Sequence, residues 1–87
     1  MLEVTMYTTT TCPYCRKAKR LLDGKGIAYK EIDVRPLGVK NEMVSRSGRR
    51  TVPQIFFGNR LVGGFDDLAQ LESEGGIDVV LSPRMAG

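Results

Sequence analysis

The sequence contains no histidine and only two cysteines, which leaves few kinds of metal site open to it. A structural zinc site uses four cysteine or histidine ligands, and this chain cannot supply that set by itself. We therefore expect no bound metal. Any nucleophilic chemistry must also proceed without a histidine base.

Long apolar runs are absent as well, and none approaches the roughly 20 residues that a membrane-spanning helix needs. The first residues lack the basic region and apolar segment of a signal peptide. Hydrophobic residues make up 41% of the chain and charged residues 26%, which is typical of globular proteins. We expect no membrane partner and a location in the reducing cytoplasm.

The excess of positive charge is small, with 13 Lys and Arg against 10 Asp and Glu. These cations are scattered and are not interleaved with aromatic residues, so we expect no nucleic acid partner. The length of 87 residues suits one domain over residues 1–87, which we expect to be monomeric. Residues 82–87 have the composition of a frayed tail.

Both cysteines lie between a predicted strand and a predicted helix. Residues 2–7 alternate in the period-two pattern of a half-buried strand. Pro13 suits the first position of a helix, which places Cys12 at or beside the N-cap. After it, apolar residues recur on one helical face: Cys15, Ala18, Leu21 and Leu22.

This placement indicates redox chemistry. Unpaired N–H groups and the positive dipole end of a helix should favour the thiolate of Cys12, which makes it the candidate nucleophile. Cys15 lies one turn further along, within disulfide reach, and continues the apolar stripe, so we expect it to be the more buried, resolving thiol. The alternatives are half of a zinc site or a static disulfide. A disulfide that closes so short a loop would stabilise the fold little, which argues against a static disulfide.

The first half of the chain predicts a strand, a helix and a second strand. Gly24 and Gly26 end the first helix, and residues 27–34 form the second strand. The two strands should be parallel and joined by a right-handed crossover. A weaker helical pattern follows from Pro36 and ends at Gly48.

The second half predicts a hairpin followed by a helix. Strands over residues 54–57 and 60–62 flank a Gly58-Asn59 turn. The next helix begins at Phe65 with acidic residues in its first turn and ends at Gly75, and a final short turn covers residues 77–81. The predicted class is α/β, a βαβ unit plus a ββα unit in a thioredoxin fold, with a four-stranded mixed sheet flanked by helices.

Three segments together resemble the signature segments of the dithiol glutaredoxins. They are Cys12-Pro13-Tyr14-Cys15, Thr51-Val52-Pro53-Gln54-Ile55-Phe56 and Gly63-Gly64-Phe65-Asp66-Asp67-Leu68. The resemblance covers about residues 3 to 81 and is greatest to the small bacterial glutaredoxins of the glutaredoxin-3 group. It implies a glutathione-dependent thiol–disulfide oxidoreductase that reduces glutathionylated and disulfide-containing proteins, with ribonucleotide reductase as a candidate partner.

Two alternatives stay open. One is a thioredoxin-like protein that is reduced by a flavoprotein reductase. The other is a homodimer that binds an iron-sulfur cluster on Cys12 and two glutathiones, as some glutaredoxin relatives do.

The resemblance also implies a glutathione site. Pro53 would follow a cis peptide bond and turn the backbone of Val52 toward the ligand. The N-terminus of the helix at Phe65 would bind the γ-glutamyl carboxylate. The implied glutathione-binding residues are Tyr14, Thr51, Val52, Pro53, Gly64, Phe65, Asp66 and Asp67.

One feature of the family pattern is missing. Many relatives carry a lysine shortly before the first cysteine, but residues 8–11 here are all threonine. The glycine carboxylate of glutathione would then need another cation. The candidates are Arg16, Lys17, Arg49 and Arg50.

Overall fold

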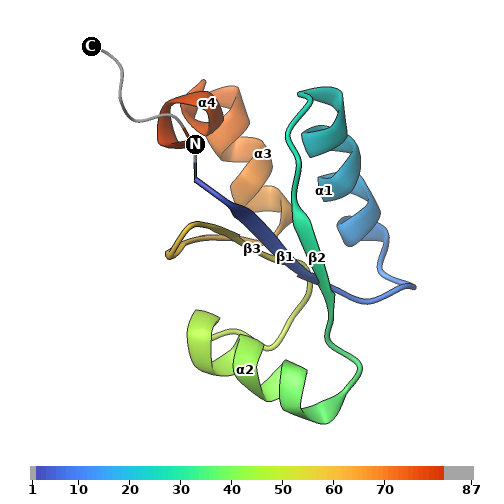
Figure 1. Cartoon of the computed structure of the whole chain (residues 1–87). Helices are drawn as coiled ribbons and strands as arrows, with labels where there is room; N and C mark the ends of the chain where they lie inside the picture. Colours follow the sequence, from blue (N-terminus) through green and yellow to red (C-terminus); the bar gives the residue numbers. More distant parts are fainter. Residues whose placement is uncertain (1, 82–87) are drawn as a thin grey trace.

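The computed structural model describes residues 2–81, and the predicted tail at 82–87 lies outside them. Figure 1 shows strands and helices following one another as the sequence predicts, except that the final short turn predicted over residues 77–81 is a six-residue helix, α4. Their bounds are β1 Val4–Thr8, α1 Pro13–Gly24, β2 Lys30–Asp33, α2 Leu37–Ser47, β3 Gln54–Phe57, β4 Arg60–Gly63, α3 Phe65–Ser73 and α4 Gly76–Leu81. None of these helices is long and apolar enough to cross a membrane.

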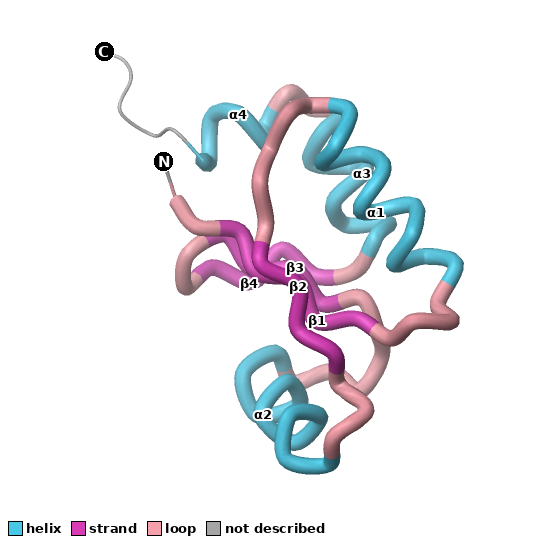
Figure 2. The backbone as a smooth tube through the Cα atoms, turned by 45° about the vertical axis from the view of Figure 1, so that its right-hand side comes forward, coloured by secondary structure: helices cyan, strands magenta, loops and turns pink. Residues whose placement is uncertain are grey.

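The four strands form one mixed sheet in the order β2-β1-β3-β4. β1 pairs in parallel with β2, and β3 pairs antiparallel with both β1 and β4. In Figure 2, α1, α3 and α4 lie on one side of the sheet and α2 lies on the other. The predicted arrangement of a βαβ unit and a ββα unit is confirmed.

The prediction that β1 is half-buried is wrong, because both of its faces are covered. Val4 and Met6 pack under α1 and α3, while Tyr7 packs with Phe56 and Met43 on the α2 side. β1 lies between β2 and β3, so its position in the middle of the sheet leaves neither face to solvent. The alternation in the sequence shows which residues of β1 share a face of the strand, but it does not show whether each face is covered.

The second strand is shorter than predicted. It begins at Lys30 rather than at residue 27, because the chain first turns around the end of α1, where the Ile27 N–H donates to the Leu22 carbonyl at 3.0 Å. The weaker helical pattern after Pro36 is confirmed as α2. It ends at Gly48, which has the left-handed conformation (φ 72°) that favours glycine.

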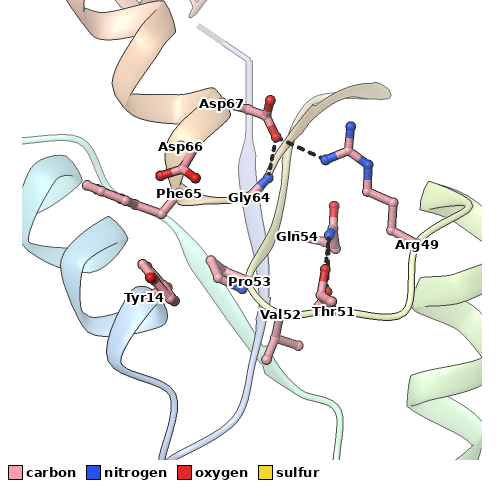
Figure 3. A pocket seen from close by; sticks show the side chains of 10 residues that line it. All are labelled: Tyr14, Arg49, Thr51, Val52, Pro53, Gln54, Gly64, Phe65, Asp66 and Asp67. Atoms are coloured by element: carbon pink, nitrogen blue, oxygen red, sulfur yellow. Dashed lines mark hydrogen bonds and ion pairs between the residues drawn. The ribbon is translucent and has the colours of Figure 1, made fainter.

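The parallel pairing of β1 and β2 decides where the cysteines lie. Parallel strands end at the same edge of a sheet, and the chain leaves β1 at this edge to enter α1. Cys12 begins α1 there. The loop from α2 to β3 and the turn from β4 to α3 approach the same edge (Figure 3).

Candidate active site

Cys12 occupies the N-cap of α1, as the sequence predicts. Its backbone is extended (φ −87°, ψ 115°), and its sulfur accepts a hydrogen bond from the Cys15 N–H at 3.2 Å. Pro13 follows in the first turn, where a missing N–H costs no intrahelical bond. The Cys12 sulfur is therefore held where the unpaired donors of the helix converge.

Cys15 is the buried thiol of the pair, with 1% of its surface exposed. Burial, together with a hydrogen bond to Cys12, raises the pKa of Cys15 to about 12, and a hydrogen bond from the Thr9 backbone and the charge of Lys19 act against the rise. Cys15 is therefore a neutral thiol at neutral pH. The predicted order of exposure is confirmed.

The Val52–Pro53 peptide bond is cis, and the Val52 backbone lies beside Cys12. The Cys12 thiol donates to the Val52 carbonyl across 3.6 Å. Among residues 2–81, no group accepts a hydrogen bond from the Val52 N–H. An extended peptide lying here would find both a donor and an acceptor on one residue.

The N-terminus of α3 forms the opposite side of the site. The Gly64 N–H donates to Asp67 Oδ2 at 3.0 Å, and Arg49 Nη1 forms an ion pair with the same oxygen at 2.9 Å. The Arg49 guanidinium, with the Gly64 N–H, lowers the pKa of the Asp67 carboxyl. Because a helix leaves its first N–H groups unpaired, Phe65 and Asp66 present free donors to an anion.

Gly63 makes the approach of Arg49 to Asp67 sterically possible. Its φ is +118°, which side chains disfavour. A Cβ atom at this position would also lie 2.3 Å from Asp67 Oδ2 and 2.8 Å from Arg49 Nη1. The ion pair therefore occupies the space that the missing side chain leaves.

The Val52 segment and the N-terminus of α3 border a pocket of about 350 Å³ (Figure 3), and Cys12 adjoins it through its contact with Val52. All eight residues that the sequence suggested for glutathione line it, joined by Arg49 and Gln54. Sequence reasoning missed Gln54. The available signal was a polar residue at the start of an otherwise apolar strand, and its side chain proves to be buried, with Nε2 donating to the Thr51 carbonyl at 3.0 Å.

The candidate cations differ in their positions. Lys17 Nζ lies 5.1 Å from the ring centroid of Tyr14 and 5.9 Å from that of Phe65, within the range of a cation–π interaction. Arg49 lines the pocket, whereas Arg16 and Arg50 are exposed and are not among the lining residues. The structure thus brings one cation from α1 and one from the α2–β3 loop to the site.

Comparison with known proteins agrees with this geometry. Residues 4–62 match the family model described as Glutaredoxin. Glutaredoxin 3 of Escherichia coli strain K12 is 48% identical over 82 residues, covering 93% of this chain and 99% of the relative.

Solved structures show the same resemblance. The solution structure of the Brucella melitensis glutaredoxin superimposes with a TM-score of 0.82 at 45% identity, covering 99% of this chain and 96% of that one. The buckwheat glutaredoxin–glutathione complex gives a TM-score of 0.85 at 26% identity, covering 94% and 78%. With these relatives, a thioredoxin fold and two adjacent cysteines, the chain belongs to the glutaredoxin family of thiol oxidoreductases.

Proposed function

We propose that this protein is a glutathione-dependent thiol–disulfide oxidoreductase that reduces glutathione mixed disulfides and protein disulfides. One observation carries the proposal: the Cys12 sulfur lies at the N-terminus of α1, 3.6 Å from the carbonyl of a pocket residue, Val52. The reactive sulfur is therefore adjacent to backbone groups that suit a peptide ligand. The buckwheat relative, which binds glutathione, supports this choice of ligand.

The two thiols take different parts because their environments differ. The Cys12 sulfur lies at the N-terminus of α1 and is the more exposed of the two, while the pKa of about 12 keeps Cys15 protonated. Cys12 is thus the nucleophile and Cys15 the resolving thiol. No histidine enters this scheme, because the N-terminus of a helix generally favours a negatively charged group.

The pocket suits the three parts of glutathione. The N–H and C=O of Val52 pair with the cysteine residue of the tripeptide, as a neighbouring strand would. The free N–H groups of Phe65 and Asp66 bind the γ-glutamyl carboxylate. The ammonium group pairs with the exposed Asp66 carboxylate rather than with Asp67, which Arg49 and Gly64 already occupy.

Other residues that line the pocket, together with Lys17 beside it, complete this arrangement. Tyr14, Thr51 and Pro53 form the walls beside the sulfur. Lys17 and Arg49 supply positive charge for the carboxylates of the ligand. These cations take the place of the family lysine that is absent before Cys12.

The reaction begins when the Cys12 thiolate attacks the glutathione sulfur of a mixed disulfide. A bond forms between Cys12 and glutathione, and the substrate leaves as a thiolate that takes a proton from water. A second glutathione thiolate then attacks the bound glutathione, which yields glutathione disulfide and free Cys12.

Reduction of a protein disulfide requires both cysteines. Cys12 attacks one substrate sulfur and forms a mixed disulfide, and Cys15 then attacks the Cys12 sulfur and releases the reduced substrate. Two glutathione molecules afterwards reduce the Cys12–Cys15 disulfide and are themselves oxidised.

A coupled assay tests the proposal. Reduction of a glutathionylated peptide is followed through NADPH oxidation, with electrons supplied either by glutathione and glutathione reductase or by thioredoxin reductase. We expect turnover with glutathione and little with thioredoxin reductase. Efficient turnover with thioredoxin reductase alone would instead identify a thioredoxin-like protein.

A further inference from the structure

The buried position of Cys15 creates a chemical difficulty for the resolving step. A thiol must lose its proton before the sulfur can attack a disulfide, and burial opposes the charge that results. Lys19, four residues further along the same helix, carries a positive charge that lowers the pKa of Cys15 and so opposes the effect of burial.

Lys19 lies one turn after Cys15 on the same face of α1. Residues at this spacing have Cβ atoms roughly 5–6 Å apart. Side chains on a helix also tilt toward its N-terminus, so the lysine stem extends back in the direction of Cys15. The mutual electrostatic effect of Lys19 and Cys15 on their pKa values agrees with this proximity.

The ammonium of Lys19 is held by Glu31, whose carboxylate is in turn held by Thr8. Lys19 Nζ forms an ion pair with Glu31 Oε2 on β2 at 2.5 Å. The same carboxylate oxygen accepts a hydrogen bond from Thr8 Oγ1 at 2.7 Å, and Thr8 is itself 2% exposed at the end of β1. Lys19 and Thr8 both lower the pKa of Glu31, so the carboxylate stays charged at neutral pH. Tyr29 is the other titratable group beside Lys19.

We propose that Lys19 is a positioning residue for the resolving step, whose ammonium, held by the Glu31 carboxylate that Thr8 anchors, stabilises the Cys15 thiolate as the disulfide closes. The inference rests on the proposed function. In this step the Cys15 proton passes to solvent, a bond forms between Cys15 and Cys12, and the bond from Cys12 to glutathione breaks. The departing glutathione sulfur takes the electron pair and then a proton, so no further oxidant is required.

A purely structural role would have different consequences. If the Lys19–Glu31 pair only tied α1 to β2, its loss would lower the free energy of unfolding without changing how disulfide closure depends on pH. The rate of closure as a function of pH therefore separates the two roles.

The experiment mixes reduced protein with glutathione disulfide and stops the reaction with acid at successive times. Mass spectrometry then measures the Cys12–glutathione adduct and the closed disulfide, across neutral and mildly alkaline pH. The variants are Lys19→Met, Lys19→Gln and Lys19→Arg. The exposed neighbour Arg20 provides a control that removes the same charge, as Arg20→Met.

Closure should be about two- to fivefold slower in Lys19→Met and Lys19→Gln, since a partly exposed charge is worth up to about 0.7 pKa unit. The plot of rate against pH should be displaced to higher pH, while Lys19→Arg and Arg20→Met should close at nearly the normal rate. Normal closure in both neutral variants would overturn the inference. So would a Lys19→Arg protein as slow as Lys19→Met, because charge would then not be the cause.

The proposed function is tested separately in the same material. The Cys15→Ser protein has no ring to close, so its reduction of glutathione mixed disulfides does not depend on the resolving step. If that activity is present, a normal closure rate in the Lys19 variants refutes only the role of Lys19. If Cys12 never forms the glutathione adduct, the proposed function itself fails.

Discussion

Replacing Gly63 by alanine should both destabilise the fold and weaken the ligand site. The residue has a φ of +118°, and an added Cβ would meet Asp67 Oδ2 at 2.3 Å and Arg49 Nη1 at 2.8 Å. Both of those atoms are ends of flexible side chains, so they can move away. Their movement would break the ion pair and the bond from the Gly64 N–H that caps α3.

The magnitude is the sum of three effects. A non-glycine residue in this backbone conformation costs on the order of 1–3 kcal/mol. Loss of the cap adds about 0.5–2 kcal/mol, and loss of a half-exposed ion pair adds at most about 1 kcal/mol. We expect Gly63→Ala to lower the free energy of unfolding by about 1.5–6 kcal/mol, and each kcal/mol corresponds to a fall in Tm of roughly 4–8 °C for a domain of this size.

Urea and thermal unfolding followed by circular dichroism measure this change, and the coupled assay gives the KM for glutathione. Displacement of the α3 N-terminus should raise KM more than it lowers kcat. Gly38→Ala is a matched control, because Gly38 lies in α2 and an added Cβ there meets no atom within 4 Å. That variant should be stabilised by about 0.5–1 kcal/mol.

Asp67→Ala separates the backbone effect from the loss of contacts. It removes the ion pair and the cap but leaves the conformation of Gly63 unstrained, so it should cost less stability than Gly63→Ala. If Gly63→Ala unfolds at the same temperature as the wild-type protein, the argument from backbone strain is refuted. If Asp67→Ala is the more damaging variant, the cap and ion pair outweigh the strain.

The remaining predictions concern the cysteines and the α2 side of the sheet. Cys12→Ser should abolish all exchange in the coupled assay, whereas Cys15→Ser should keep mixed-disulfide reduction and lose reduction of protein disulfides; the reverse pattern would exchange their roles. Iodoacetamide at neutral pH should alkylate Cys12 and spare Cys15, because the raised pKa keeps Cys15 protonated until the pH approaches about 12; peptide mapping that finds equal labelling would contradict this. Tyr7→Phe should cost about 1 kcal/mol in urea unfolding, since the Tyr7 hydroxyl donates to Glu42 at 2.5 Å and accepts from Arg46 at 2.8 Å, and an unchanged midpoint would show that these bonds do not stabilise the protein.

Local sequence determined most of the secondary structure and the core of the active site. Pro13 after Cys12 specifies the start of a helix, and Gly58-Asn59 specifies a tight hairpin, because each depends on the backbone preferences of a few adjacent residues. The order of exposure of the two cysteines follows from the apolar stripe of the same helix. Pro13 and the apolar periodicity were therefore sufficient to predict which of the two thiols is buried.

The resemblance to the family motif predicted a second part of the site. The segment from Thr51 to Pro53 reads by itself as the start of an edge strand, and only its resemblance to the glutaredoxin pattern predicted the cis bond. The structure then placed this segment beside Cys12, 40 residues away in the chain. Proximity over such a separation depends on the topology of the whole sheet.

Tertiary structure alone decided the burial of β1 and the pairing of charges. Tyr7 is buried because α2 covers it, and the pattern around Tyr7 contains no information about a helix that begins 30 residues later. Arg49 is near Asp67, and Lys19 near Glu31, because loops and strands from separate parts of the chain converge. Local sequence cannot distinguish between lysines and arginines that are all expected to be exposed, because their neighbours depend on the tertiary structure. The motifs therefore indicated the family, but the sequence left open which of the candidate cations lies beside the pocket.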